Sequence, residues 1–563
     1  MDTLDKLKNC KSKFGLSKII GIKLKKITYI LFVKKYNLYT EFQIPKNNGK
    51  FRNISAPNKY LKIIQKKLKK VLEECYNEIQ LNKNASHGFL KKKSIYTNSN
   101  FHKNKRYVLN IDLKDFFPSI NFGRVRGFFI KNKNFQLNEE VATLIAQISC
   151  YNNQLPQGSP SSPIISNLIA ISLDKGLSIL SKKYKFNYTR YADDITISTN
   201  LKNFPIAIAY KDKDGNCKLG SELIKVINNN HFDINFDKIR MQYKSSRQEV
   251  TGLIVNKKVN VKRNYIRKTR LMLYNLIKNP NSDDYQSIRN CIEGRIAFIY
   301  QIRKMNFENN KRDIAKKMKD MFFYFDKIIN NQKITIITEG KTDKVYLSSA
   351  YSHFKEYYKL NFQIITKIPY TKHDSNNINN TGDQTLMNFV KELKEKNNIK
   401  PYKYLLEKSK IKNPKNPVIV IFDRDRINII KEFEKNIKNE NCKFVFFEPN
   451  IYYFVLPKLI GKEYLSIEYY FPNKILNKKI KGKNLSLCQE KHKKHIIYKI
   501  DENNDGLSKN EFSKYIKKLR YNTKRDNILN EKNKKYFDNF KSIFDIINDI
   551  RKDYKNKLQN INK

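Results

Sequence analysis

The sequence lacks paired cysteines, long apolar runs and enough acidic residues to match its basic ones. Its seven cysteines are scattered without a CxxC pair, which argues against a zinc ribbon or disulfide framework and favours a reducing cytosol. The N-terminal stretch MDTLDKLKNCKSK has no apolar core of the kind found in signal peptides. No apolar run approaches membrane-spanning length. These absences predict a cytoplasmic protein without a membrane partner.

Acidic residues are the most conspicuous shortage. The chain of 563 residues has 112 Lys and Arg against 53 Asp and Glu, a formal net charge of +59. Codon bias accounts for part of the Lys, Asn and Ile excess, but it does not require acids to be so outnumbered. Such a charge destabilises a compact protein unless a polyanion neutralises it, so we expect a nucleic-acid partner and strongly salt-dependent binding. The length predicts two or more domains.

Two adjacent carboxylates, Asp193 and Asp194, stand in RYADDITIS, at a predicted hairpin turn. Upstream, RYVLNIDLKDFF alternates so that Asp112 lies on the face opposite the apolar side chains. Polymerases need carboxylates from separate segments to hold two divalent metals, one for the primer hydroxyl and one for pyrophosphate. A surface turn alone would explain Asp193 and Asp194. The polymerase interpretation is favoured by Asp112 and by the Gly/Pro/Ser loop that precedes an apolar helix in LPQGSPSSPIISN (155–167).

These segments resemble the reverse transcriptases over about the first 300 residues, because NIDLKDFFPSI, LPQGSPSSP, YADD and NFDKIR follow that family's order. The resemblance implies an α+β right-hand fold with fingers, palm and helical thumb. It implies that Asp112, Asp193 and Asp194 bind Mg²⁺, with Mn²⁺ as an alternative ion. It also implies contacts with the incoming dNTP from Arg52, Phe117 (as a gate against the 2′-OH), Gln157, Gly158 and Lys238 (as proton donor to pyrophosphate). For Arg52 and Lys238, a plain solvated cation is an equally good interpretation.

Two short segments resemble those of retron reverse transcriptases. NSNFH (98–102) is similar to their Asn-Ala-x-x-His element, with Ser in place of Ala, and Val250-Thr251-Gly252 matches their Val-Thr-Gly triplet. The resemblance implies RNA binding by Asn98, His102, Val250, Thr251 and Gly252. It further implies a cognate non-coding RNA and a branched RNA–DNA product (msDNA) started from a guanosine 2′-OH. The basic helical region 262–330 then serves as thumb, suited to folded RNA.

The second half follows a different pattern. KITIIT (333–338) and VIVIF (418–422) are continuous apolar runs, typical of strands buried on both faces of a parallel sheet. FQIIT (362–366) and CKFVFF (442–447) are two further candidates. Helix patterns lie between them, in VYLSSAYSHF and LMNFVKELKE, and a polar loop is expected over 373–383. The order predicts a small α/β domain.

Acidic residues directly follow the two strongest of these strands. Glu339 and Asp343 stand in EGKTD, and Asp423 and Asp425 in FDRD. Open α/β sheets place ligands at the carboxyl ends of their strands, so these acids are candidates for holding Mg²⁺.

This region resembles a TOPRIM domain, the metal-binding module of topoisomerases, primases and overcoming-lysogenization-defect nucleases, over about 333–470. The resemblance implies Glu339, Asp423 and Asp425 as metal ligands and Asp343 as the additional acid of the nuclease branch. Lys341 would neutralise phosphate charge in the transition state. No topoisomerase tyrosine domain or primase zinc module stands beside it, so nuclease is the best interpretation.

The combination resembles a retron class in which reverse transcriptase and TOPRIM effector share one chain. It implies an anti-phage toxin–antitoxin system in the bacterial cytoplasm, silenced by the hybrid until a phage factor disturbs it; a homo-oligomer is a further expectation. We expect fingers and palm over 1–255, thumb and linker over 256–330, TOPRIM over 331–472, and a basic, helical extension over 473–563.

Two alternatives stay open: an enzyme like a group II intron protein, and a TOPRIM fold that only scaffolds the RNA–DNA complex. Two further patterns are interpreted as ordinary structure. The acidic stretch 501–506 imitates a calcium loop, but Phe512 stands where the last ligand should be Glu. His492 and His495 are taken as solvated.

Overall fold

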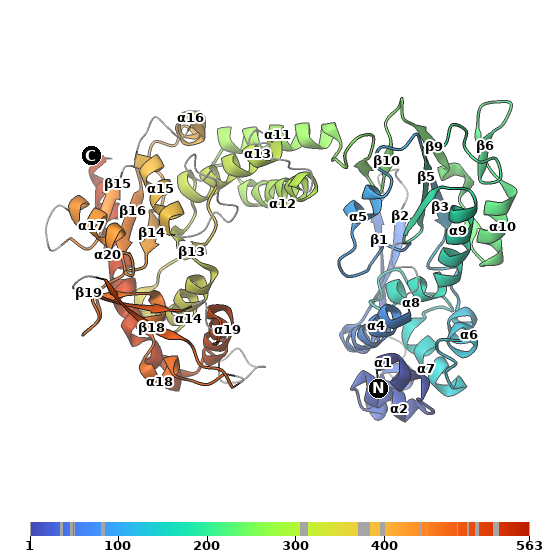
Figure 1. Cartoon of the computed structure of the whole chain (residues 1–563), viewed down its shortest axis with the longest axis horizontal. Helices are drawn as coiled ribbons and strands as arrows, with labels where there is room; N and C mark the ends of the chain where they lie inside the picture. Colours follow the sequence, from blue (N-terminus) through green and yellow to red (C-terminus); the bar gives the residue numbers. More distant parts are fainter. Residues whose placement is uncertain are drawn as a thin grey trace. The chain divides into compact units, whose positions relative to one another are not determined.

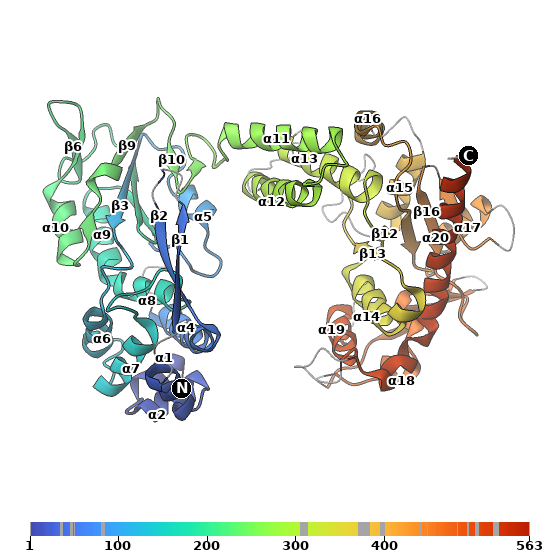
Figure 2. The same cartoon turned by 180° about the vertical axis from the view of Figure 1, so that it is seen from behind.

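The computed structural model describes residues 2–561 apart from 34–37, 46–48, 50, 80–84, 305–312, 370–382, 395–399, 438–441, 448, 481, 493–494, 502–505 and 522–528. The predicted loop 373–383, save Asp383, and most of the acidic stretch 501–506 therefore lie outside the described residues. The chain divides into two compact units, residues 1–266 with 301–308 and residues 267–300 with 309–563. Figures 1 and 2 show the elements of each.

A five-stranded antiparallel sheet forms the centre of the first unit. Its order is β4 (Asn187–Tyr191), β5 (Asp194–Thr199) and β3 (Tyr107–Lys114), and β3 also pairs with β8 (Asp233–Ile234) and β9 (Arg240–Tyr243). The predicted alternation is confirmed, because Leu109, Ile111 and Leu113 lie in the main core and Asp112 occupies the alternate position. The register places Asp112 opposite Asp194.

Helices and small hairpins surround this sheet. The helices are α1 (Thr3–Lys8), α2 (Lys13–Ile20), α3 (Leu24–Thr28), η1 (Tyr29–Val33), α4 (Lys59–Ile79), α5 (Ile95–Asn100), α6 (Phe122–Lys131), α7 (Glu139–Ser149), α8 (Ser162–Ile169), α9 (Ile171–Lys183), α10 (Ser221–Asn229) and η3 (Phe236–Lys238). The hairpins are β1 (Tyr39–Pro45) with β2 (Phe51–Pro57), β6 (Ala209–Lys211) with β7 (Cys217–Leu219), and β10 (Glu249–Val250) with β11 (Leu253–Ile254).

The apolar helix predicted after the Gly/Pro/Ser loop is α8, whose first turn contains a proline and whose side chains are almost all buried. In the described ranges, no single helix is long and apolar enough to cross a membrane; α8 and α9, bent by 46°, meet that test only as a pair. The described residues of the region 262–330 are mostly helical, as predicted, with α11 (Arg263–Lys278), α12 (Tyr285–Lys304), α13 (Ile314–Phe323) and η4 (Tyr324–Ile329).

The second unit is built on a mixed sheet in the order β13 (Phe362–Ile365), β12 (Ile334–Ile337), β14 (Val418–Phe422), β16 (Ile451–Val455) and β15 (Val445–Phe447). The first four strands are parallel, and β12 and β14 are buried throughout. The parallel α/β arrangement is thus confirmed. CKFVFF instead gives a short antiparallel edge strand, β15. β14 lies between β12 and β16, and β16 was not predicted from the sequence.

Helices α14 (Lys341–Tyr358), α15 (Asp383–Lys394), α16 (Lys400–Ser409) and α17 (Ile427–Asn436) accompany this sheet. After it come β17 (Tyr464–Leu465), η5 (Ile467–Tyr470), α18 (Asn473–Leu476), β18 (Leu487–His492), β19 (His495–Ile500), α19 (Lys509–Leu519), η6 (Glu531–Phe540) and α20 (Lys541–Ile561). The basic extension is helical near its end, as predicted, but its earlier part contains β18 and β19, which form a sheet with β17 and were not expected.

The C-terminal helix packs on the parallel sheet of the same unit. The Tyr452 hydroxyl of β16 donates to Asp553 (2.6 Å), and the Tyr358 hydroxyl of α14 donates to Asp545 (2.7 Å). The Tyr554 hydroxyl donates to the Pro414 carbonyl (2.6 Å). Because these bonds join α20 to three parts of the domain, this helix contributes to the core and is not an appended tail.

Candidate functional site

Three carboxylates meet at one end of the central sheet of the first unit. Asp112 lies near the end of β3, Asp194 opens β5 directly opposite it, and Asp193 lies in the turn between β4 and β5. The turn is tight, with Ala192 at φ 58°. The Leu113 N–H donates to the Asp193 carbonyl (3.0 Å) and holds the turn against β3. The sequence thus correctly predicted that these carboxylates converge.

The electrostatics of this cluster favour a cation. Burial, followed by the charges of Asp193 and Asp112, raises the pKa of Asp194 to about 7, although this residue keeps an exposed surface. Burial, with the charge of Asp112, also raises the pKa of Asp193. The Lys238 ammonium donates to Asp112 Oδ2 (2.8 Å), as does the Asn235 amide (3.1 Å). Only one cationic side chain contacts Asp112 directly among the described residues, so the carboxylate cluster as a whole is under-neutralised.

A divalent ion would supply the missing charge, and carboxylates are suitable ligands for Mg²⁺. In the described ranges, no three His, Cys, Asp or Glu side chains lie close enough together to enclose a metal ion.

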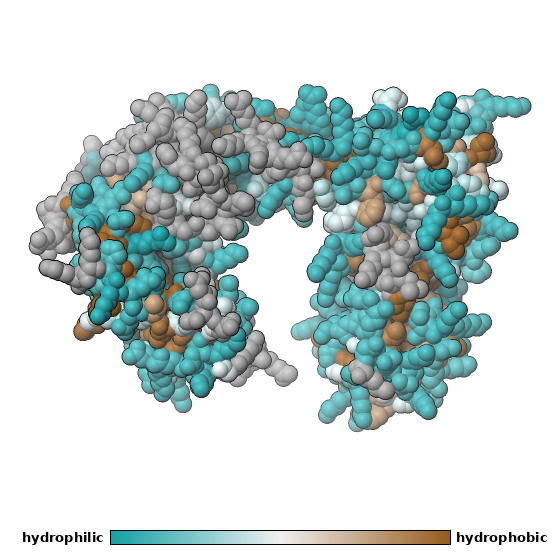
Figure 3. All heavy atoms as spheres, viewed as in Figure 1, coloured by the Kyte–Doolittle hydropathy of each residue, from teal (hydrophilic) through white to brown (hydrophobic). Residues whose placement is uncertain are grey.

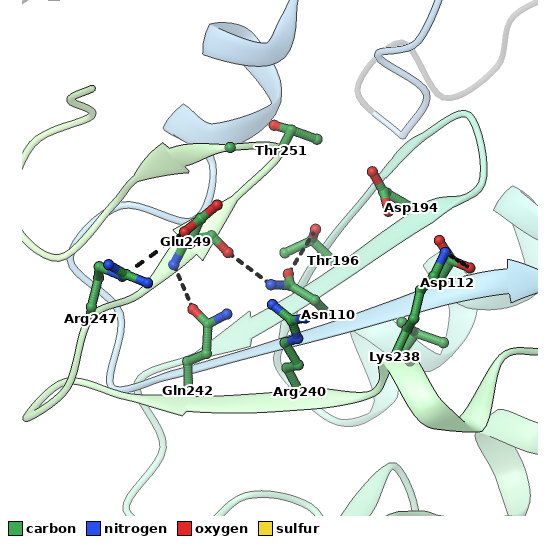
Figure 4. Close-up of a pocket in the computed structure, with 12 residues that line it drawn as sticks. Asn110, Asp112, Asp194, Thr196, Lys238, Arg240, Gln242, Arg247, Glu249 and Thr251 are labelled. Atoms are coloured by element: carbon green, nitrogen blue, oxygen red, sulfur yellow. Dashed lines mark hydrogen bonds and ion pairs between the residues drawn. The ribbon is translucent and has the colours of Figure 1, made fainter. Parts of the chain in front are cut away.

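A cavity of about 270 Å³ lies beside the carboxylates. Figure 4 shows Asp112 and Asp194 at one end of it and Arg247 toward the other. Its lining is polar and carries both signs of charge. Asp112 and Asp194 are among its acids, while Lys238, Arg240 and Arg247 are cations of the kind that bind the phosphates of a nucleic acid. The lining residues are Asn110, Ile111, Asp112, Asp194, Thr196, Lys238, Arg240, Gln242, Arg247, Glu249, Thr251 and Gly252.

The expected nucleotide-binding residues lie on elements near this end of the sheet. The Gln157 carbonyl accepts from the Ser55 N–H (2.8 Å), which joins the Gly/Pro/Ser loop to β2, the strand that carries Arg52. Gly158, at φ 127°, has no room for a side chain, since a Cβ would lie 2.7 Å from the Ser55 carbonyl oxygen. The positive charge of Arg52 acts on Asp193. Phe117 packs edge-on against Phe116. Their contacts with a nucleotide stay predictions.

The residues predicted to bind RNA are mostly internal, which corrects that expectation. Asn98, His102 and Val250 are fully buried. His102 joins the hydroxyls of Thr189 and Ser198 (both 2.7 Å), and Asn98 accepts from the Thr189 hydroxyl (2.6 Å). Burial lowers the pKa of His102 to about 3, so its ring is neutral. Side chains used in this way cannot contact RNA directly.

The two retron-like segments instead form one hydrogen-bond network. The Ser99 hydroxyl donates to the Val250 carbonyl (2.9 Å), and the Asn98 amide reaches the Thr251 hydroxyl (3.4 Å). This network links the hairpin β4–β5, which carries Asp193 and Asp194, through Thr189 and Ser198 to the turn between β10 and β11. Of the predicted residues, Thr251 and Gly252 line the cavity, so RNA contact stays a prediction for these two.

A second acidic cluster lies at the carboxyl ends of β12 and β14 in the second unit. Asp343 is in the first turn of α14, where its carboxylate accepts from the Gly340 N–H (2.8 Å). Burial, followed by the charge of Glu468 and with a smaller effect of Glu339, raises the pKa of Asp343 to about 7. Burial and the charges of Asp343, Asp425, Glu339 and Glu468 raise that of Asp423. The predicted acids are therefore brought together. Lys341 is exposed at the start of α14.

Glu468, on η5, is the member that the sequence did not reveal. It is only 1% exposed, and neither carboxylate oxygen has a hydrogen-bond partner among the described residues. Lys509 Nζ lies 3.8 Å from Oε1. A buried carboxylate without hydrogen bonds is costly, so this position also favours a cation. The available signal was a lone acid inside the apolar run YLSIEYYF (464–471).

Comparison with known proteins agrees with the geometry of the first unit. Residues 44–255 match the family described as reverse transcriptase (RNA-dependent DNA polymerase), so this part of the chain is similar to reverse transcriptases. Among its relatives is the Retron Mx162 reverse transcriptase of Myxococcus xanthus, 32% identical over 313 residues, 51% of this chain and 63% of the relative. The chain thus spans less than two thirds of that protein's length.

Two further relatives are informative. The Retron Ec86 reverse transcriptase of Escherichia coli is 29% identical over 292 residues, 51% of this chain and 83% of the relative. A putative COX1/OXI3 intron 2 protein of Saccharomyces cerevisiae is 29% identical over 206 residues, 34% of this chain and 23% of the relative.

Proposed function

We propose that the chain is a retron-type RNA-directed DNA polymerase, which uses dNTPs to copy a cognate non-coding RNA into branched RNA–DNA (msDNA). The observation that carries this proposal is the convergence of Asp112, Asp193 and Asp194 beside a polar cavity, within the region that matches the reverse transcriptase family. Similarity to retron reverse transcriptases supports the retron type.

The chemistry requires two divalent ions at the three carboxylates, which would activate the attacking hydroxyl and stabilise pyrophosphate. Asp112, Asp193 and Asp194 hold the reacting atoms in place. Lys238, whose ammonium lies 2.8 Å from Asp112 Oδ2, would be the group that gives a proton to the leaving pyrophosphate. Arg240 and Arg247 bind phosphates along the cavity.

A group II intron-like enzyme is the second candidate, supported by the similarity to the intron protein. The hydrogen-bond network between residues 98–102 and 250–252 favours the retron type, because both segments that resemble retron enzymes act there as one unit.

The polymerase proposal is tested by the nucleic acid that copurifies with the protein. Asp193→Ala should abolish branched DNA, because a metal ligand is lost from the turn. Asp214→Ala removes an exposed Asp from another hairpin turn of the same unit and should leave the product unchanged. RNase treatment followed by sequencing measures the DNA. A normal branched product from Asp193→Ala would refute the assignment, and linear DNA from the wild type would favour the intron-like alternative.

We further propose that the second unit contains a TOPRIM nuclease, acting as the effector of an anti-phage system. Support comes from the position of Glu339, Asp423 and Asp425 after adjacent parallel strands, and from the raised pKa values of Asp343 and Asp423. Here Mg²⁺ would be held by these acids together with Glu468. The alternative is a scaffold that holds the RNA–DNA complex without cutting.

The effector proposal is tested in cells challenged with phage and with the purified full chain. Asp423→Ala and Glu468→Gln should still make branched DNA but lose protection, and Mg²⁺-dependent cleavage of nucleic acid should disappear. Glu407→Gln changes an exposed acid on α16 and should behave as wild type. If Asp423→Ala still protects cells, the second unit is a scaffold and not a metal nuclease.

A further inference from the structure

Arg190 is a fully buried cation directly before the Tyr191–Asp194 segment. Its side chain has no exposed surface. The guanidinium binds Asp174 of α9 through two hydrogen bonds, Nε to Oδ1 (2.7 Å) and Nη2 to Oδ2 (2.8 Å). Asp174 in turn accepts from the Tyr188 hydroxyl (2.6 Å). The ion pair stands apart from solvent and cannot reach a substrate.

One further bond joins Arg190 to the catalytic turn. Its Nη1 donates to the carbonyl of Ala192 (3.0 Å), the residue between Tyr191 and Asp193. Ala192 has a φ of 58°, a left-handed conformation that non-glycine residues seldom adopt without support. The same Nη1 also reaches Asn167 Oδ1 of α8 (3.3 Å). The guanidinium therefore connects the turn to two core helices.

The segment 85–88 also packs closely against the turn. A Cβ on Gly88 would lie 2.7 Å from the Ala192 nitrogen. The Arg190 backbone is bonded twice to this segment, donating to the Ala85 carbonyl and accepting from the His87 N–H (both 2.8 Å). The turn is held by this segment and by the guanidinium, so loss of either contact would let it shift.

We infer that Arg190, anchored by Asp174, is a positioning residue for polymerisation, which fixes the Ala192–Asp193 turn so that Asp193 and Asp194 present their carboxylates together to metal. This inference rests on the proposed polymerase function. A buried ion pair contributes little net stability compared with apolar residues. The planar, multidentate guanidinium gives directional control that an ammonium does not. Groups that orient metal ligands influence metal affinity without touching the ion.

The test compares Arg190→Lys with Tyr188→Phe. The lysine keeps a cation near Asp174 but cannot reproduce the fork that also binds Ala192. Tyr188→Phe removes a different buried hydrogen bond from the same carboxylate and leaves the bond to Ala192 in place. Both variants should melt at lower temperature than wild type. Only Arg190→Lys should need more Mg²⁺ for half-maximal RNA-templated DNA synthesis, by roughly 10-fold to 100-fold.

A second readout is independent of turnover, namely Mn²⁺ binding measured by electron paramagnetic resonance in the Asp423→Ala background. Arg190→Lys should weaken it and Tyr188→Phe should not. Should Arg190→Lys fail to fold, Asp174→Asn removes the anchoring charge at nearly constant volume and should shift the metal requirement the same way. An unchanged metal requirement in a folded variant, or an equal shift in Tyr188→Phe, would overturn the inference. Absence of RNA-templated synthesis by the wild type would instead overturn the proposed polymerase.

Discussion

Single residues in this chain are most informative where polar or strained groups are buried. Asn98 lies inside the protein, yet its amide reaches Thr251 in the turn with Gly252, which lines the cavity beside the carboxylates. Both turn residues have positive φ, 44° and 83°. Glycine tolerates this conformation, but a β-branched threonine does so at a cost. A strained residue beside a cavity indicates that its side chain is needed there.

Replacement of Thr251 by Asn should separate stability from activity. Asparagine adopts left-handed backbone readily, which offsets the lost contacts of the Thr251 hydroxyl with Asn98 and Ser99, so thermal stability should change little. RNA-templated DNA synthesis should fall by roughly tenfold to hundredfold, because the hydroxyl and methyl group at the cavity wall are lost and the bound nucleotide is misplaced. Lys185→Asn, at an exposed position with φ 53°, is the matched control. Full activity of a stable Thr251→Asn protein would show that the cavity does not use this side chain.

At the scale of elements, continuous apolar runs were sufficient to predict β12, β13 and β14. They also placed the acids that follow β12 and β14. They did not reveal β16, whose IYYFV sequence contains two tyrosines, because its burial depends on β14 and α20. They also missed β18 and β19 in a Lys- and His-rich segment, where pairing with each other and with β17 decides the structure. The local sequence pattern identifies an element when the element's own apolar residues mark it as buried. It fails when the element is buried only by partners that are distant in the sequence.

The candidate sites follow the same rule. Asp112, Asp193 and Asp194 were predictable because each lies at a recognisable position on a strand or turn. The pair Arg190 and Asp174, the acid Glu468 and the contact of Asn98 with Thr251 were not, since each depends on side chains that meet only after the chain has folded. Carboxylates at strand ends are therefore readable from sequence, whereas the groups that orient them require the structure.

The whole molecule combines a strong positive charge with two local acidic clusters. The net charge is +59, and the described surface drawn in Figure 3 is mostly hydrophilic with scattered hydrophobic groups. Even in this field, the pKa values of Asp194 and Asp343 are raised to about 7, with burial as the main cause. Local desolvation and neighbouring acids therefore outweigh the distant basic residues, which water and salt screen.

This contrast predicts how pH and metal act on the stability of the nucleic-acid-free protein. Asp343 has a pKa of about 7 when folded, against a reference value of 3.8. A carboxyl group with a raised folded pKa binds its proton more tightly in the folded state, so its contribution to stability is lost as pH rises from about 4 to about 7. In chelator, Asp343→Asn should therefore gain in melting temperature relative to wild type between pH 5 and pH 8. At pH 8, Mg²⁺ should stabilise wild type by binding the ionised acids and should stabilise the variant less.

Differential scanning calorimetry of wild type, Asp343→Asn and the exposed control Glu407→Gln measures the difference in melting temperature at each pH. The contributions of histidines and other titrating groups cancel in this difference, because all three proteins share them. A difference that stays constant with pH and with Mg²⁺ would show that Asp343 is not part of a metal-binding acidic cluster.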